Sequence, residues 1–113
     1  MFGLLEVIHG PDKGRTFTLA KGRTLQLGRA RSTAAGLSDP QVSRIHCRLE
    51  VGEGQVVVAD AGSVGGTWVN GERVERHDLQ AGDVIRIGET QLSFRWTDVD
   101  EKRTETLIPI LPS

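Results

Sequence analysis

The clearest pattern in this sequence is the alternation of hydrophobic and polar residues over short stretches. Between residues 91 and 96, Leu92, Phe94 and Trp96 occupy one side and polar residues occupy the other. Six further segments alternate in this way or form short runs rich in β-branched residues: 4–8, 15–19, 24–27, 47–51, 55–59 and 84–87. Such segments suit half-buried strands, and none repeats its hydrophobic residues at i, i+3, i+4 and i+7 over a helical length. The pattern predicts an all-β fold with little or no helix.

Glycine-rich turns separate these segments. Turn residues lie at 10–14, 21–22, 52–54, 70–71 and 81–83, and the chain has 14 glycines. Many short strands at this spacing predict a β-sandwich or a barrel. Three connections are longer, namely 28–45, 60–66 and 77–83. The first exceeds ~12–15 residues, a length that in a compact domain usually serves a function or stays unstructured.

A chain of 113 residues suffices for one domain with its own core. The alternation stops after Trp96, so we expect one domain over residues 1–96 and a charged, then proline-containing tail or linker over 97–113. No hydrophobic run approaches the ~18 residues of a membrane-spanning helix. The N-terminus lacks a secretory signal pattern and Cys47 has no cysteine partner. We therefore expect a cytoplasmic protein without a disulfide, a metal or a cofactor.

Opposite net charges divide the chain. Residues 1–48 carry eight basic and three acidic side chains, whereas residues 49–113 carry six basic and twelve acidic ones. Eleven of the fourteen basic residues are arginine, whose planar fork of donors suits carboxylate or phosphate. The net charge of −1 and the low aromatic content argue against a nucleic-acid partner and favour a small anionic one.

Three segments carry donors that could meet at one place. Gly-Arg at 28–29 ends a predicted strand, Ser-Arg-Ile-His at 43–46 leads into the next, and a glycine-rich segment at 60–71 joins two more. Arginine forks, a hydroxyl and free backbone amides are the donors that a phosphate dianion requires. Glycines allow the backbone to approach a ligand closely. Together the three segments predict a phosphate-binding site.

In this order the segments resemble the forkhead-associated (FHA) domain family, and the resemblance spans residues 3–96. The matching motifs are Gly10-Pro11-Asp12-Lys13-Gly14-Arg15, Gly28-Arg29, Ser43-Arg44-x-His46 and Gly66-Thr67-x-Val69-Asn70-Gly71. The resemblance implies an eleven-strand β-sandwich of the SMAD/FHA type that recognises phosphothreonine peptides and is not an enzyme. The implied partner is a phosphothreonine-containing protein or peptide, such as a Ser/Thr kinase or its substrate.

The resemblance also implies roles for individual residues. Arg29 and Ser43 match the family residues that contact the phosphate, and Arg44 matches a position that binds phosphate or peptide backbone. Alternatively, Arg44 could pair with Asp39. Gln41 lies where the family sometimes selects the third residue after the phosphothreonine. Structural roles are implied for Gly28, His46, Thr67, Asn70 and Gly71, and Asn-Gly is a favoured pair for a two-residue hairpin turn.

The segment 63–67 departs from the family pattern. The family commonly has Ser-Thr-Asn-Gly-Thr, in which the first Thr helps to bind phosphate and the Asn holds the peptide backbone. Val64 and Gly65 stand at those two positions here, and neither offers a side-chain hydrogen bond. At ~1 kcal/mol per lost hydrogen bond, binding would weaken about tenfold to thirtyfold. We expect weakened or altered phosphopeptide binding; the alternative is an FHA-fold interaction or assembly module that binds partners independently of phosphate.

Other functions have less support. A triad of Ser43, His46 and Asp60 lacks a nucleophile elbow, and the chain has no nucleotide-binding P-loop motif. Three scattered histidines and one cysteine do not match a zinc motif. In the tail, Thr104 and Thr106 could be phosphorylated and dock on a neighbouring chain.

Overall fold

The computed structural model describes residues 2–30, 33 and 35–98. These residues form eleven strands and no helix, so the prediction of an eleven-strand all-β sandwich is confirmed. The strands are β1 (Phe2–His9), β2 (Thr16–Leu19), β3 (Thr24–Gly28), β4 (Ala35–Gly36), β5 (Cys47–Gly52), β6 (Gln55–Asp60), β7 (Thr67–Val69), β8 (Glu72–Val74), β9 (Arg76–Asp78), β10 (Val84–Ile87) and β11 (Thr90–Thr97). The phosphorylation of Thr104 and Thr106 stays a prediction, because these residues lie outside the described ones. None of the described residues belongs to a helix that could cross a membrane.

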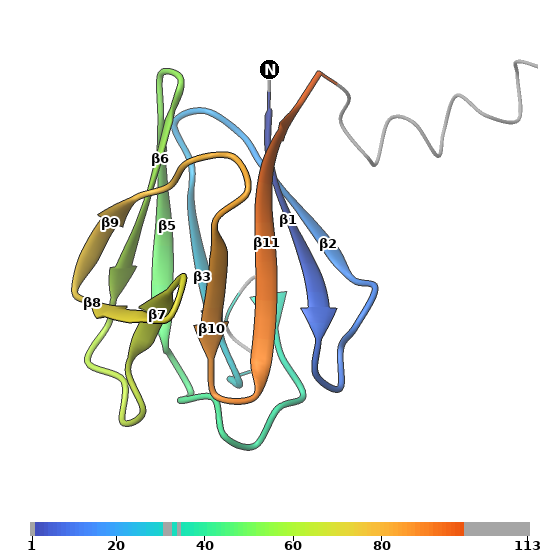
Figure 1. Cartoon of the computed structure of the whole chain (residues 1–113), viewed down its shortest axis with the longest axis vertical. Coiled ribbons are helices and arrows are strands. Elements are labelled where there is room, and N and C mark those ends of the chain that lie inside the picture. Colours follow the sequence, from blue (N-terminus) through green and yellow to red (C-terminus); the bar gives the residue numbers. More distant parts are fainter. Residues whose placement is uncertain (1, 31–32, 34, 99–113) are drawn as a thin grey trace, which may run out of the picture.

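Two sheets pack face to face in the sandwich (Figure 1). One has six strands in the order β2-β1-β11-β10-β7-β8, and the other has five in the order β4-β3-β5-β6-β9. In β5, Cys47, Leu49 and Val51 are buried and the residues between them are partly exposed, as the alternation predicts. Their side chains join those of both sheets in one continuous core, in which Phe94 is among the largest fully buried side chains. Burial of this core holds the sheets together and leaves the connecting loops to carry polar groups.

Two short strands differ from the sequence-based expectation. Residues 35–36 form β4, which pairs in parallel with β3 inside the long connection 28–45. Residues 76–78 form β9, which pairs with β6, so the connection expected at 77–83 begins only after Asp78. Both strands lie at an edge of the five-stranded sheet and have two or three residues. Such short edge strands carry no detectable alternation, because their position depends on the neighbouring strand.

The turn between β7 and β8 has the Asn-Gly pair in its two central positions. Asn70 has φ +51° and Gly71 has φ +85°, the left-handed values that a two-residue type I′ turn requires. The Asn70 side chain also donates to Asp83 and accepts from the Val84 amide, both at 2.9 Å. These bonds fix the β7–β8 hairpin against the start of β10.

Several connections gather at one end of the sandwich, which we call the loop end (Figure 1). Among them are the described residues of the connection 29–46, interrupted by β4, residues 61–66 between β6 and β7, and the short turn between β10 and β11. Strand β1 begins, and β11 ends, at the opposite end of the molecule (Figure 1). The topology thus brings together the segments 28–29, 43–46 and 60–71, which are far apart in the sequence.

Candidate functional site

Backbone hydrogen bonds bring Arg29 next to Ser43 and Arg44. The Arg29 amide donates to the Ser43 carbonyl and the Ala30 amide donates to the Arg44 carbonyl, both at 3.0 Å. Because β3 and β5 are antiparallel neighbours, these bonds continue their pairing beyond the sheet. The side chains expected to contact phosphate therefore emerge from two adjacent chain segments at the loop end.

Gly28 leaves room for this pairing. A Cβ atom at Gly28 would overlap the Arg44 carbonyl oxygen and would lie 2.7 Å from the carbonyl carbon. Any side chain at this position would push the segment that carries Arg44 away from β3. Glycine is needed here for close backbone approach, not for an unusual φ.

The two arginine side chains are exposed, and neither has a carboxylate partner among the described residues. Arg29 Nε donates to the Val42 carbonyl at 3.1 Å, which fixes the orientation of the guanidinium group. This bond leaves both Nη groups available to a ligand. The Arg44 guanidinium makes no ion pair among the described residues. The alternative pairing of Arg44 with Asp39 is absent, because the buried Asp39 carboxylate accepts instead from the Gln41 and Glu89 amides and the Thr90 hydroxyl.

Ser43 connects two loops through its hydroxyl. The Val64 amide in the β6–β7 loop donates to Ser43 Oγ at 3.0 Å. A hydroxyl that accepts one hydrogen bond still has its own proton to donate. Ser43 is half-buried and adjoins two exposed arginines, Arg44 in the sequence and Arg29 through the backbone hydrogen bond, so a ligand oxygen bound there can receive that proton.

His46 joins the same two loops from below the surface. The Ser43 amide donates to His46 Nδ1 at 3.0 Å, and His46 Nε2 lies 2.8 Å from the Gly66 carbonyl. Because Nδ1 accepts, the proton of the neutral ring must be on Nε2, which donates to Gly66. The imidazole is completely buried and bridges the segment of Ser43 to the β6–β7 loop.

Asp60 organises the β6–β7 loop. Its carboxylate accepts from the Gly62 and Ser63 amides and from the Ser63 and Thr67 hydroxyls. Burial raises the pKa of the Asp60 carboxyl, but these hydrogen bonds outweigh burial, and the pKa lies below its ordinary value of 3.8. The carboxylate therefore stays ionised near neutral pH and keeps the loop in one conformation.

The residues that replace the family's Thr and Asn lie at the tip of this loop. Val64 is 94% exposed, so its hydrophobic side chain faces solvent. A Cβ atom at Gly65 would meet nothing within 4 Å, and its φ is not in the left-handed region. Gln41 is exposed but lies elsewhere, against Gly88 in the β10–β11 turn. The loop tip thus has an apolar side chain and a glycine in place of polar side chains, and the amides of Val64 and Gly66 already donate to Ser43 Oγ and Ser63 Oγ.

The arrangement does not form a hydrolytic triad. Both nitrogens of His46 are taken by backbone groups, and the Asp60 carboxylate is engaged within its own loop. Burial raises the pKa of the Cys47 thiol to about 12, so this cysteine is a poor nucleophile. In the ranges 2–30, 33 and 35–98, no cluster of His, Cys, Asp or Glu could hold a metal ion.

Two carboxylates that anchor the loops were not predicted from the sequence. Asp39 fixes residues 39–41 to β11 and Asp60 fixes residues 62–67, yet neither was assigned an anchoring role. The role of Asp60 could have been predicted, because an Asp followed two or three residues later by Gly or Ser is typical of a turn closed by the carboxylate. The bond from Asp39 to Thr90 joins residues 51 positions apart and has no local signal.

Arginines without a carboxylate partner gather at the loop end. Among the described residues, the paired arginines are Arg15, Arg48, Arg76 and Arg95. The unpaired ones are Arg23, Arg29, Arg44, Arg73 and Arg86. Arg23 precedes β3 at the opposite end, whereas the other four surround the loops described here. Four arginines at the loop end therefore form no ion pair with a carboxylate in the described part of the chain.

Comparisons with known proteins agree on one kind of fold. The model of the family "Inner membrane component of T3SS, cytoplasmic domain" matches residues 6–98. A solved structure from an analysis of phosphothreonine-dependent FHA domain interactions has a TM-score of 0.79 and 30% identity, covering 88% of this chain and 100% of that chain.

Curated relatives are longer than this chain. The "Oxoglutarate dehydrogenase inhibitor" of Corynebacterium efficiens is 41% identical over 91 residues, which are 80% of this chain and 63% of the relative. The "Glycogen accumulation regulator GarA" of Mycolicibacterium smegmatis is 44% identical over 93 residues, which are 80% of this chain and 57% of the relative. The chain thus spans less than two thirds of the length of these two relatives.

Proposed function

Because the chain belongs to the forkhead-associated (FHA) domain family, and to the family that includes the T3SS cytoplasmic domain, we propose that it is a phosphothreonine-dependent protein-interaction module. Its partner is a protein that a Ser/Thr kinase has phosphorylated on threonine. We further propose that it acts in the cytoplasm as an adaptor without catalytic activity. The relatives whose printed names describe an inhibitor and a regulator are consistent with a non-catalytic role.

The observation that carries this proposal is the convergence of uncompensated donors at the loop end. Among the described residues, the Nη groups of Arg29 and the guanidinium of Arg44 have no carboxylate partner, and the hydroxyl of the adjacent Ser43 can still donate its proton. A phosphate dianion presents three strong acceptor oxygens, which match two forks and a hydroxyl. Hydrogen bonds to a charged group contribute ~1.5–3 kcal/mol each, so these contacts discriminate strongly between phosphothreonine and threonine.

The site is organised before a ligand binds. His46 and the Val64 amide hold Ser43, and Asp60 holds the loop that contains Val64. Because these groups are already ordered, binding loses little conformational entropy in the protein. Val64 and Gly65 nevertheless provide no side-chain hydrogen bond to the peptide. We expect micromolar affinity at best, about −8 kcal/mol.

A peptide array tests this function. Matched peptides that carry phosphothreonine, phosphoserine or plain threonine are probed with the chain and with Arg29→Ala. We expect binding to the phosphothreonine peptides alone, and its near-complete loss in Arg29→Ala. The matched control is Arg23→Ala, which removes an equally unpaired arginine from the opposite end and should bind as the unaltered chain does. Partner binding that persists in Arg29→Ala would instead support the phosphate-independent interaction module.

A further inference from the structure

Two arginines flank Trp68 in a lateral row on the outer face of the six-stranded sheet. The strand register pairs Arg86 of β10 with Trp68 of β7, and Trp68 with Arg73 of β8. Directly paired residues point to the same face of a sheet, so the three side chains stand side by side. The Arg86 guanidinium lies 4.8 Å from the centre of the Trp68 ring. We call these three residues the Arg–Trp–Arg row.

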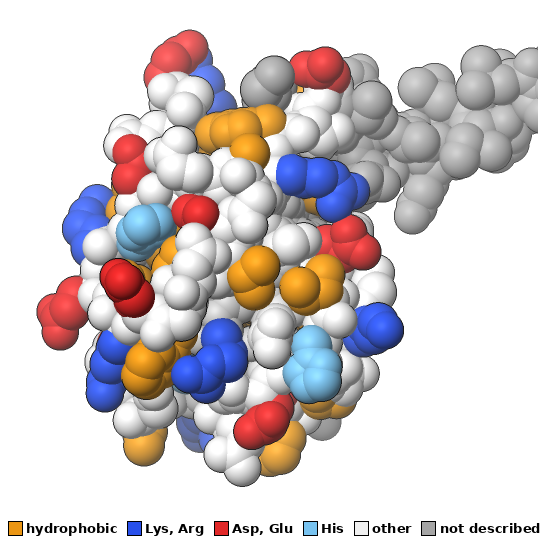
Figure 2. Space-filling model, viewed as in Figure 1, with side chains coloured by type: hydrophobic (Ala, Val, Ile, Leu, Met, Phe, Trp, Pro, Cys, Tyr) orange, Lys and Arg blue, Asp and Glu red, His pale blue; other side chains and the backbone are white. Residues whose placement is uncertain are grey.

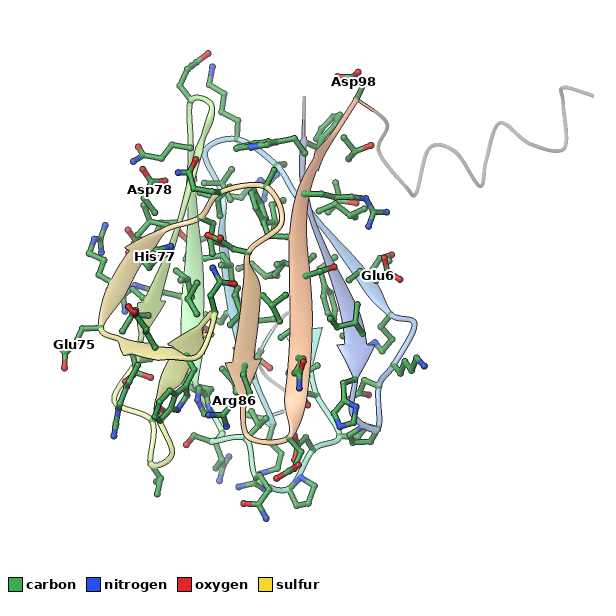
Figure 3. The ribbon with its side chains drawn as sticks, in the orientation of Figure 1. Glu6, Glu75, His77, Asp78, Arg86 and Asp98 are labelled. Atoms are coloured by element: carbon green, nitrogen blue, oxygen red, sulfur yellow. The ribbon has the colours of Figure 1, made fainter. Side chains whose placement is uncertain are left out.

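The row lies at the loop end of the sheet. Figure 3 shows Arg86 at the lower end of β10, where the loops gather. In the same orientation, Figure 2 shows basic side chains on both sides of a hydrophobic one at the lower left of this face. The acidic neighbours in sequence, Glu72 and Glu89, form no ion pair with either arginine. Both positive charges of the row are therefore available to a ligand.

The row borders the phosphate-binding segments on two sides. Arg73 lies against the β6–β7 loop, since a Cβ atom at Gly66 would be 2.6 Å from Arg73 Nε. Arg86 Nη1 lies 3.5 Å from the Gly88 carbonyl, and a Cβ atom at Gly88 would be 2.8 Å from Gln41 Cβ. Gln41 is two residues before Ser43. The row is therefore adjacent to both of the loops that flank the proposed phosphate site.

We propose that the Arg–Trp–Arg row binds the carboxylates of an acidic stretch in the same peptide that carries the phosphothreonine. This inference rests on the proposed function. Arginine forks match carboxylates in geometry as well as charge. Because the guanidinium of Arg86 covers one face of the Trp68 ring, the ring orients a cation and is a poor platform for stacking a nucleobase. We place the acidic stretch three to six residues from the phosphothreonine, because an extended peptide of that length spans roughly 10–20 Å.

Fluorescence polarisation with labelled peptides tests the row. One phosphothreonine peptide has neutral flanks, and two others have three glutamates three to six residues before or after the phosphothreonine. A fourth peptide has neutral flanks and plain threonine. At low ionic strength we expect one of the two acidic peptides to bind roughly threefold to tenfold more tightly than the neutral phosphopeptide, because exposed ion pairs contribute modestly. The gain should vanish at high salt, since such pairs are screened.

Variants of the row locate the effect. Arg86→Gln and Arg73→Gln should each remove most of the gain from the glutamates and keep the affinity for the neutral phosphopeptide. Arg23→Gln is the matched control, because it removes the same charge from an unpaired arginine at the opposite end and should keep the gain. The salt dependence of the unaltered chain provides a second readout that does not depend on how the variants fold.

The outcomes separate this inference from the proposed function. If both acidic peptides bind no better than the neutral phosphopeptide, or if Arg23→Gln removes the gain as fully as Arg86→Gln, the row is not an acidic-peptide site and phosphothreonine binding still stands. If the neutral phosphopeptide binds no better than its plain-threonine form, the proposed function fails and this inference fails with it.

Discussion

The Val64 amide donates a hydrogen bond to Ser43 Oγ at 3.0 Å and so joins two loops, although the two residues are 21 positions apart in the sequence. This bond uses one acceptor site of the hydroxyl and leaves the hydroxyl proton available to a ligand. The contact between Ser43 and Val64 thus both orders the β6–β7 loop and orients the proposed phosphate donor. One substitution should affect both roles.

Replacing Ser43 with alanine removes the hydroxyl and keeps the hydrogen bond that the amide of residue 43 donates to His46 Nδ1. We expect the affinity for a phosphothreonine peptide to fall at least about tenfold, because a hydrogen bond to a charged group contributes ~1.5–3 kcal/mol. Isothermal titration calorimetry measures the change. Ser93→Ala in β11, away from the loop end, is the matched control and should bind normally. Equal affinities of the two variants would exclude Ser43 from the site.

Gly65→Asn should strengthen phosphopeptide binding. The position has open space for a side chain and a φ that asparagine adopts without strain. One additional hydrogen bond to the peptide backbone, at ~1 kcal/mol, corresponds to roughly fivefold tighter binding. The control is Gly65→Ala, which adds Cβ without the amide and should change the affinity little. If asparagine and alanine behave alike in polarisation assays, the peptide does not pass over this part of the loop.

Gly28→Ala should destabilise the fold and impair the site together. The added methyl group overlaps the Arg44 carbonyl, so the segment that carries Ser43 and Arg44 must move. Over-packing of this kind typically costs ~1–3 kcal/mol, which chemical denaturation measures as a lower free energy of unfolding. The control is Gly36→Ala: its φ is not in the left-handed region, and among the described residues the added Cβ would meet one atom within 4 Å, the Ala30 carbonyl oxygen at 3.6 Å. Gly54→Ala is less suitable because Gly54 has φ +63°. A stability of Gly28→Ala equal to that of Gly36→Ala would contradict the packing of β3 against this segment.

Binding should weaken as the pH falls from 7 to 5, and the cause should lie in the ligand. The second pKa of phosphothreonine is ~6, so the dianion becomes a monoanion in this range. On the protein side, the pKa values of Asp39 and Asp60 lie below 3.8: burial raises both, but hydrogen bonds outweigh it. A carboxyl group whose pKa is lower in the folded state stabilises the fold at every pH above its unfolded-state pKa. This stabilisation is lost only as the pH falls through the folded-state pKa, well below 5.

A ligand with a different ionisation separates the two causes. A peptide that carries a difluorophosphonate in place of the phosphate ionises at lower pH, so its binding should persist to lower pH than that of the phosphothreonine peptide. Thermal unfolding at pH 7 and pH 5 reports on the fold itself. Identical pH profiles for the two ligands would assign the pH dependence to the protein and contradict the prediction.

The strands were predictable from the sequence where alternation extends over several residues. In β11, Leu92 and Phe94 are buried and Ser93 between them is partly exposed, because each residue's side of the sheet follows from its position alone. β4 and β9 could not be found in this way. Their pairing partners β3 and β6 are separate segments of the chain, and two or three residues are too few to define a period.

The site was predictable only in part for a similar reason. Arg29 follows one strand that alternation predicts, and Ser43 precedes the next. Because these two strands are antiparallel, the two residues meet at one end of the sheet. By contrast, Asp39 reaches Thr90 in β11, 51 residues further along the chain. The Arg–Trp–Arg row depends on the register of three strands, β10, β7 and β8. No local pattern encodes either relationship.

The most direct measurement is an NMR titration of the ¹⁵N-labelled chain with a phosphothreonine peptide and with the same peptide carrying plain threonine. With the phosphopeptide we expect the amide signals of Arg29, Ser43 and Val64 to shift together, and we expect no shift of them with the plain peptide. Equal shifts with both peptides, or shifts confined to the opposite end around residues 52–54, would contradict a phosphate-selective site at the loop end.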